Sequence, residues 1–228
     1  MSTTKPQLND FLLRRLHSLL GVLPLAGFIV FHFFANSYST KGDKAFNQVV
    51  DTLRSTPYIH LISWGLLVGP FLLHIIIGIW IVFSGRNNLT RQAHPRNFAY
   101  FAQRITAIII MVFVVYHYVS MKYIYLPKTP DDYYAILRAK FANPAIYGFY
   151  ALGIAATAFH LANGLCTFCM TWGITVSARS QKLMAIAMTG VGILIFALGM
   201  NALSGFVRSP KSETTAVAAA PTEKPATP

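Results

Sequence analysis

The sequence contains few charged residues and very few acidic ones. Only 11% of its 228 residues are charged, and Asp and Glu together number 7, whereas a typical soluble domain has about 25% charged residues. Hydrophobic residues make up 54% of the chain, and the mean hydropathy is +0.49. This composition excludes an ordinary soluble domain and predicts an all-α membrane protein that crosses the bilayer several times.

Acidic side chains are missing from every long apolar segment. A proton relay or a transporter of hard cations would be expected to place Asp or Glu near the middle of the membrane. Their absence argues against both. The formal net charge of +12 comes mainly from Lys and Arg in loops and at segment ends, where these residues contact anionic lipid headgroups. A nucleic-acid partner is therefore not expected, whereas membrane lipid is.

Cysteine is also scarce, because the chain has only Cys166 and Cys169. Two cysteines inside an apolar segment do not make a disulfide framework. The sequence C-T-F-C is followed by Met170 rather than His, so it is not the attachment signal of a c-type haem. Both thiols are expected to act as small packing residues.

Five apolar segments are each long enough for the roughly 20 residues that span a bilayer. They are expected at 14–38, 58–84, 98–126, 144–173 and 180–206, within a transmembrane domain covering 1–210. The first is longer than the apolar part of a signal peptide, about 7–15 residues. A short amphipathic helix is expected from Asp131 to Ala142, and the Ala/Pro-rich tail, 211–228, is expected to be disordered.

Four histidines recur at an almost constant spacing, one in each of the first four segments. They are His32, His74, His117 and His160, separated by 42, 43 and 43 residues. An ionisable side chain is costly in hydrocarbon, so each intramembrane histidine suggests a functional site. A single histidine of this kind is more often a hydrogen-bonded packing residue, but four at one period indicate a common role.

The direction of each span converts these positions into depths in the membrane. At 1.5 Å per residue, His32 and His117 lie roughly 27–29 Å from the N-terminal side, and His74 and His160 lie roughly 15–20 Å from it. Each pair joins next-but-one helices, which face each other across a four-helix bundle. Two imidazoles at one depth match axial ligation of haem iron, so the sequence predicts two bis-histidine haems, one at His74/His160 and one at His32/His117.

Neighbouring residues favour an open interior for one pair. Gly78 and Gly164 follow His74 and His160 by four residues, which leaves the same helix face without a side chain one turn away and gives room for a flat macrocycle. Pro24 and Pro70 are expected to kink the first two spans.

Three sets of residues together resemble a known family: the stretch from Leu13 to Pro24, the Gln103-Arg104-Ile105-Thr106 motif and the four spaced histidines. They resemble the five-span, di-haem cytochrome b subunit of succinate dehydrogenase and fumarate reductase, in particular the menaquinone type of Gram-positive bacteria. The resemblance covers nearly all of residues 10–206.

The resemblance implies a non-catalytic subunit that carries electrons between an iron–sulfur subunit and menaquinone, while a flavoprotein subunit oxidises succinate. It places the chain in the bacterial cell membrane. His74 and His160 would ligate the haem nearer the cytoplasmic face, and His32 and His117 the haem nearer the outer face and menaquinone.

Basic residues near the membrane ends favour a cytoplasmic N-terminus. Arg14 and Arg15 precede the first span, and the loop 86–104 is basic and free of acidic residues, which agrees with the positive-inside tendency. Four side chains at the cytoplasmic ends of spans one and three are expected to contact a propionate of the inner haem or the iron–sulfur partner: Arg15, His17, Ser18 and Arg104.

Two other functions remain open from the sequence. One is a di-haem cytochrome b that serves a hydrogenase or formate dehydrogenase. The other is a haem-free membrane transporter or assembly factor, in which the histidines would form a transport path or pack against neighbouring helices.

Overall fold

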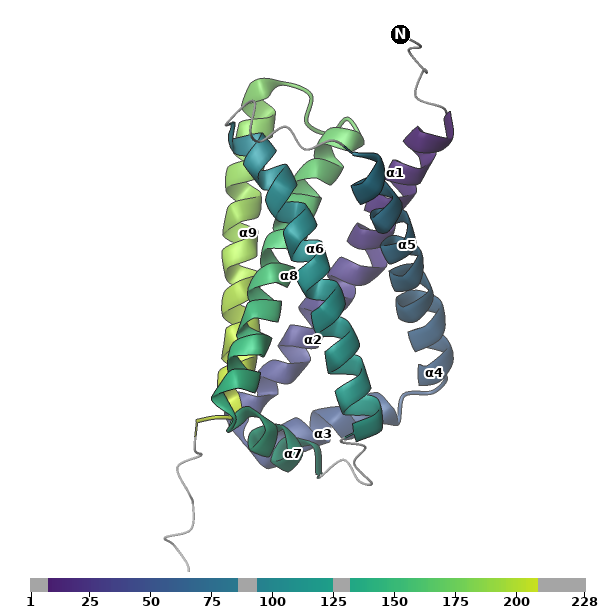
Figure 1. Cartoon of the computed structure of the whole chain (residues 1–228). Helices are drawn as coiled ribbons and strands as arrows, with labels where there is room; N and C mark the ends of the chain where they lie inside the picture. The colour runs from purple at the N-terminus through teal and green to yellow at the C-terminus, as the bar shows by residue number, and fades with distance from the viewer. Residues whose placement is uncertain (1–7, 86–93, 125–131, 209–228) are drawn as a thin grey trace, which may run out of the picture.

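The computed structural model describes residues 8–85, 94–124 and 132–208, and in these ranges the chain is helical without strands (Figure 1). Five helical stretches are long and apolar enough to cross a membrane: Asp10–Lys41, Ile59–Ser84, Pro95–Tyr123, Pro144–Thr171 and Ala178–Gly205. The prediction of an all-α membrane protein with five transmembrane helices is confirmed. The tail that we expect to be disordered lies outside the described residues.

The first two spans each contain a widened helical turn. Span one consists of α1 (Leu8–Leu20), the π-helical η1 (Gly21–Ala26), α2 (Gly27–Ser37) and the 3₁₀ turn η2 (Tyr38–Lys41). Span two consists of α4 (Ile59–Ile62), the π-helical η3 (Ser63–Val68) and α5 (Gly69–Ser84). Pro24 lies inside η1, and Pro70 follows η3 at the start of α5. Because proline lacks an N–H and clashes with the preceding turn, the helix accommodates it where the turn is wider.

The last three spans begin with recognisable capping residues. They are α6 (Pro95–Val119), which continues into the π-helical η4 (Ser120–Ile124), α8 (Pro144–Thr171) and α9 (Ala178–Gly205). Proline in the first turn of α6 and α8 replaces an N–H that has no partner within the helix. The side chains of His94, Asn143 and Ser177 accept hydrogen bonds from free N–H groups in the first turns of these helices, which fixes where each helix starts.

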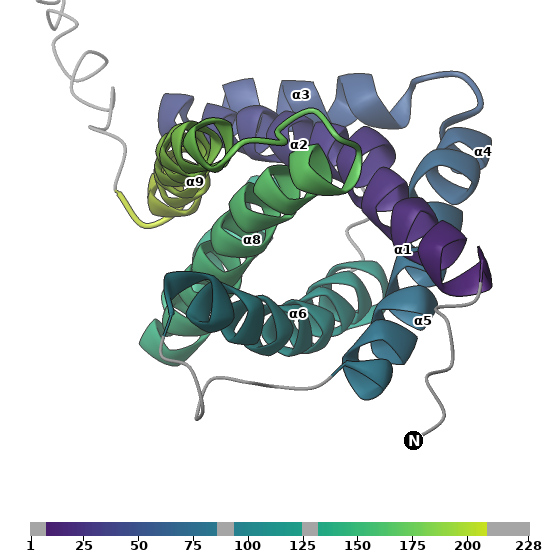
Figure 2. The same ribbon diagram turned by 90° about the horizontal axis from the view of Figure 1, so that it is seen from above.

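Helix α8 is central to the packing of the spans. Viewed along their axes, α1–α2, α5, α6 and α8 form four sides of the molecule, and α9 lies outside them against α2 and α8 (Figure 2). Of the most apolar stretch of α8, 44% is buried, against 11% or less for each other span. Small residues allow this close contact; a Cβ at Gly153 would collide with the ring of Phe113.

Large apolar side chains cover much of the outer surface. Leu23, Ile76, Phe83 and Leu194 are between 62% and 85% exposed. Such a surface is unfavourable in water and favourable against lipid tails. In lipid, the backbone N–H and C=O groups must form their hydrogen bonds within the protein, as they do in a helix. The outward faces of the spans are therefore suited to hydrocarbon.

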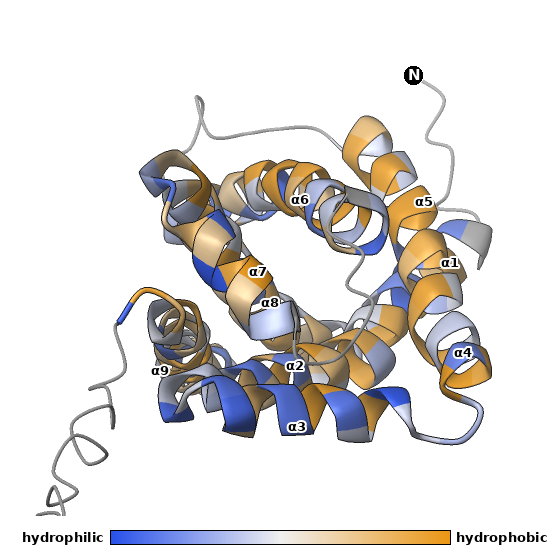
Figure 3. Ribbon diagram, turned by 90° about the horizontal axis from the view of Figure 1, so that it is seen from below, coloured by the Kyte–Doolittle hydropathy of each residue, from blue (hydrophilic) through white to orange (hydrophobic). Residues whose placement is uncertain are grey.

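Two shorter helices, α3 (Asp43–Arg54) and α7 (Asp132–Phe141), lie across one end of the spans (Figure 1). The polar side of α3 faces outward (Figure 3). Helix α7 confirms the short helix expected near Asp131–Ala142. Helix α3 was not predicted, although Phe46, Val49, Val50 and Leu53 follow the i, i+3, i+4, i+7 pattern of an amphipathic helix.

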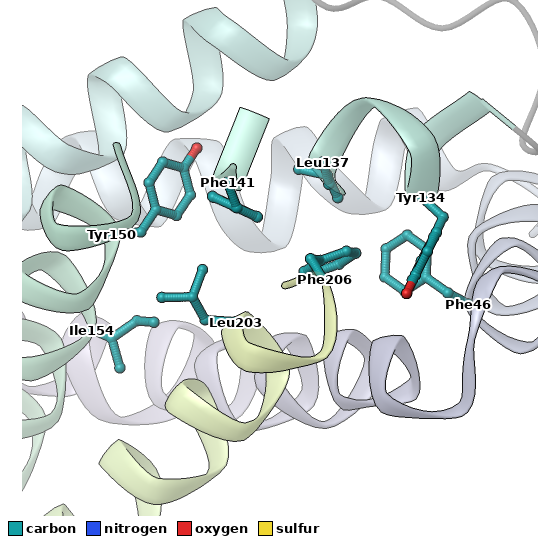
Figure 4. Close-up of a cluster of buried hydrophobic side chains, with 8 residues drawn as sticks. All are labelled: Phe46, Tyr134, Leu137, Phe141, Tyr150, Ile154, Leu203 and Phe206. Carbon is teal, nitrogen blue, oxygen red and sulfur yellow. The ribbon is translucent and has the colours of Figure 1, made fainter. Parts of the chain in front are cut away.

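An apolar cluster joins α3 and α7 to the ends of α8 and α9 (Figure 4). Its buried members are Phe46, Tyr134, Leu137, Phe141, Tyr150, Ile154, Leu203 and Phe206. The hydroxyl of Tyr134 donates a hydrogen bond to the carbonyl of Gly205 at 3.2 Å. The cluster fixes α7 against α8, which positions polar side chains of α7 beside the third and fourth spans.

Candidate functional site

The four spaced histidines form two pairs in the structure. The ring centroids of His32 and His117 are 5.8 Å apart with planes at 83°, and those of His74 and His160 are 6.4 Å apart with planes at 76°. These are the pairs expected from membrane depth. Two imidazoles on opposite sides of one metal, with metal–nitrogen bonds of about 2 Å as at zinc, have centroids roughly 6 Å apart. Both pairs therefore have the spacing that a shared metal centre requires.

His17 lies directly against His74. Their rings stack with centroids 3.9 Å apart, and the Nδ1 atom of each lies 3.0–3.1 Å from the backbone carbonyl oxygen of the other. A carbonyl oxygen only accepts, so each Nδ1 carries a proton and donates, which leaves the lone pair of Nε2 available. The 3.9 Å separation is too short for a metal between these two rings. His17 thus orients His74.

Gln103 has the corresponding position beside His160. Nδ1 of His160 lies 3.2 Å from the Gln103 carbonyl oxygen, and Nε2 of the Gln103 side chain donates to the His160 carbonyl at 3.1 Å. Thr106 Oγ1 is 3.4 Å from the same Nδ1, and Asn163 donates to Gln103 Oε1 at 2.9 Å. The Gln103–Thr106 motif therefore holds the His160 imidazole, again with Nε2 available.

Spans one and two form one helical hairpin, and spans three and four form another. In both hairpins the orienting residue and its histidine are separated by the same number of residues. His17 and His74 are 57 residues apart, as are Gln103 and His160. The glycines expected to leave room for a macrocycle instead face these orienting side chains. A Cβ on Gly78 would lie 3.0 Å from Cε1 of His17, and one on Gly164 would lie 3.7 Å from Nε2 of Gln103.

The second pair is held by side chains rather than by backbone carbonyls. Nδ1 of His117 lies 3.2 Å from the hydroxyl of Tyr150. Asn36, four residues after His32, donates to the His32 carbonyl at 2.8 Å and lies 3.5 Å from both ring nitrogens. This pair lies at the end of the molecule where α7 packs.

Lys140 of α7 is buried beside the second pair, with 4% of its surface exposed. Its Nζ donates to Ser120 Oγ at 2.7 Å and to the Tyr150 hydroxyl at 2.8 Å. Burial lowers the pKa of Lys140 to about 8, so the ammonium is still mostly protonated at pH 7. Lys140 is not among the site residues predicted from the sequence. Its position three residues after Leu137, on the buried side of α7, was the available signal.

Two of the residues expected to contact a propionate lie together at the other end of the spans. Arg15 Nη2 donates to the carbonyl of Thr171 at 3.4 Å, and its guanidinium lies over the ring of Trp172 at 4.9 Å. Ser18 Oγ accepts a hydrogen bond from the Trp172 indole at 3.1 Å and donates to the Arg15 carbonyl at 2.8 Å. The end of α1 is thus tied to the end of α8.

Arg104 is anchored between α5 and α6. Its Nη2 donates to the Val82 carbonyl at 3.0 Å and to the Tyr100 hydroxyl at 2.7 Å. Within the described part of the chain, Nε of Arg104 and Nε of Arg15 are both buried without a hydrogen-bond partner. A buried donor left unpaired is unfavourable, so both guanidinium groups have unused capacity for an anionic acceptor.

These features define a multi-pass helical membrane protein with two facing histidine pairs between its spans. The sequence profile of the succinate dehydrogenase/fumarate reductase transmembrane subunit matches residues 85–199. The chain is also 32% identical over 199 residues to the succinate dehydrogenase cytochrome b558 subunit of Bacillus subtilis (strain 168), covering 87% of this chain and 98% of that protein. The chain belongs to the family of transmembrane cytochrome b subunits of succinate dehydrogenase and fumarate reductase.

Proposed function

We propose that the chain is the non-catalytic membrane anchor of a succinate:quinone oxidoreductase and holds two haem b groups. His74 and His160 would ligate one iron, and His32 and His117 the other. The observation that carries the proposal is the separation of 6.4 Å and 5.8 Å between the paired rings. The name of the Bacillus subtilis relative, a cytochrome b558 subunit, supports haem as the group bound.

The donor set fits a haem. Each pair supplies two imidazole nitrogens, the number of axial ligands that a haem iron takes beyond the four nitrogens of its macrocycle. For His74 and His160 the protonated Nδ1 faces a carbonyl oxygen, which leaves the Nε2 lone pair available to the iron. Bound haem would supply a one-electron carrier between the soluble subunits and quinone.

The unpaired Nε atoms of Arg15 and Arg104 suit the propionates of the haem between His74 and His160. A guanidinium N–H forms a strong, charge-assisted hydrogen bond with a carboxylate, and both arginines lie at the end of the spans nearer this pair. Ser18, which orients Trp172 and the Arg15 turn, would position Arg15, and His17 would position His74.

The proposed orientation places the N-terminus in the cytoplasm of a bacterial cell. The His74/His160 pair would then be nearer the docked iron–sulfur subunit, which in turn carries the flavoprotein subunit. The His32/His117 pair would be nearer the outer face, where we propose that menaquinone binds. The chain itself would supply ligands, orientation and burial rather than a succinate site.

The test is the haem-to-protein ratio with a reduced-minus-oxidised spectrum of the purified complex, with exposed His60→Ala as the matched control. We expect two haems in the wild type and in His60→Ala. His74→Ala and His160→Ala should lose one and the same haem, and His32→Ala and His117→Ala the other. A wild type without haem would overturn the proposal and return the four histidines to a transport path or to packing.

The same purified complex also distinguishes the proposed function from a cytochrome b that serves a hydrogenase or formate dehydrogenase. Soluble subunits that co-purify with the chain and oxidise succinate support the proposed complex. A co-purifying hydrogenase or formate dehydrogenase would instead assign the chain to another quinone-linked enzyme.

A further inference from the structure

Lys140 is connected to His117 along two separate routes. Through the Tyr150 hydroxyl, 2.8 Å from Nζ, it reaches the Nδ1 atom of the His117 ring at 3.2 Å. Through Ser120 Oγ, 2.7 Å from Nζ, it reaches the backbone carbonyl of His117 at 3.1 Å. One ammonium group is therefore linked both to the ring and to the helical turn that carries it.

The three side chains in this network come from different elements and are all buried. Lys140 lies on α7, Ser120 begins η4 after α6, and Tyr150 lies on α8; their exposed fractions are 4%, 1% and 5%. In Figure 4 the Tyr150 hydroxyl points away from Ile154 and Leu203, out of the apolar cluster. Lys140 also lies 5.0 Å from the centre of the Tyr116 ring, an arrangement that stabilises a buried cation.

The hydrogen-bond roles follow from chemistry. An ammonium group only donates, so the Tyr150 hydroxyl accepts from Lys140. If His117 binds iron through Nε2, its Nδ1 is protonated, and the same hydroxyl accepts from it as well. A hydroxyl oxygen has two lone pairs, which allows both bonds at once.

We propose that Lys140 is a positioning residue for His117, which it orients through Tyr150 and Ser120 while placing a positive charge one hydrogen-bonded group from the ligand. This inference rests on the proposed haem ligation by His117. A nearby positive charge favours the reduced iron, which carries one positive charge fewer. An acceptor on Nδ1–H makes the imidazole a stronger donor and favours the oxidised iron. Lys140 and Tyr150 therefore act on the potential of the outer haem in opposite directions.

The test is a redox titration of both haems in the purified complex carrying Lys140→Met, with Arg138→Met as the matched control. Arg138 lies on the same helix with its side chain exposed, so the control removes an equal charge from the outward side of α7. We expect Lys140→Met to lower the potential of the haem lost in His117→Ala, and to leave the other haem unchanged. Arg138→Met should leave both potentials at their wild-type values.

Tyr150→Phe provides the second arm, because it keeps the ring in the apolar cluster and removes only the hydroxyl. We expect it to raise the potential of the same haem. If Lys140→Met does not assemble, Tyr150→Phe still tests whether the hydroxyl that links Lys140 to His117 affects the potential of this haem. Lys140→Arg should restore the charge but not the compact contact with both oxygens, so the potential should recover in part.

The outcomes separate this inference from the proposed function. A wild type without haem overturns both. A wild type with two haems whose potentials are the same in Lys140→Met, Tyr150→Phe and Arg138→Met overturns the role of Lys140 and leaves the haem ligation intact. Equal shifts of both haems in Lys140→Met would indicate a general loss of packing and would also overturn the inference.

Discussion

An imidazole that ligates metal must be held by its second nitrogen, and in this protein the acceptor differs between the two pairs. His74 and His160 donate to backbone carbonyls, which cannot be removed by changing the residue that carries them. His117 faces the Tyr150 hydroxyl, which a single substitution removes. At the scale of single residues, the His32/His117 pair is therefore the more easily tuned of the two.

The Gln103 side chain allows a test of how strongly His160 is held. We expect Gln103→Leu to remove the bond to the His160 carbonyl and to leave the Asn163 amide without its acceptor. The loss should be about 1–2 kcal/mol, which lowers the thermal midpoint by roughly 2–8 °C. Thermal unfolding of the purified protein checks this, and the exposed Gln48→Leu should change the midpoint little. Equal midpoints for the two variants would contradict the role assigned to Gln103.

Side chains cap the first turns of the last three spans, and α8 shows the clearest example. Asn143 Oδ1 accepts hydrogen bonds from the N–H groups of Ala145 and Ile146 at 2.9 and 3.4 Å. Because α8 packs against α6 and α9 and carries His160, the position of its first turn affects the whole set of spans.

Asn143→Ala should therefore lower stability by about 1 kcal/mol, or roughly 2–4 °C in the thermal midpoint. Asn143→Ser keeps an oxygen that can accept from the same N–H groups, and we expect its midpoint to stay near that of the wild type. Comparing the thermal midpoints of the two variants tests whether the capping hydrogen bond stabilises the protein. A serine variant as unstable as the alanine variant would show that the capping bond is unimportant.

The five spans and the two histidine pairs were predictable because both follow from the thickness of the membrane's hydrocarbon layer. Hydrocarbon thickness fixes how many apolar residues a span needs and also the depth of a residue along it. The stacking of His17 on His74 and the burial of Lys140 were not predicted, since they depend on contacts between segments far apart in the sequence. The direct contact of Gly78 with His17 was not predicted for the same reason, since it also joins segments far apart in the sequence.

At the scale of the whole molecule, the ends of the spans differ in character. One end carries α3, α7 and the apolar cluster around Phe206, and the other carries the start of α1 (Figure 1). With the proposed orientation, the first end faces outward and the second faces the cytoplasm and the soluble subunits.

Labelling of single cysteines in a chain with Cys166→Ser and Cys169→Ser tests this orientation. Asp43 and Arg179 are both exposed and lie at opposite ends of the spans. We expect a membrane-impermeant maleimide to label Asp43→Cys in intact cells, and Arg179→Cys only after the membrane is opened. The reverse pattern would invert the orientation, and the cysteine-free chain provides the background.

The repeated hairpin also has a consequence for biogenesis. The first hairpin carries His32 and His74, and the second carries His117 and His160, so each pair takes one ring from each hairpin. A nascent chain that has inserted only two spans has rings at two depths, but none of them faces its partner. On the proposed function, cofactor capture must therefore wait until the fourth span has entered the bilayer, and capture then locks the two halves of the protein together.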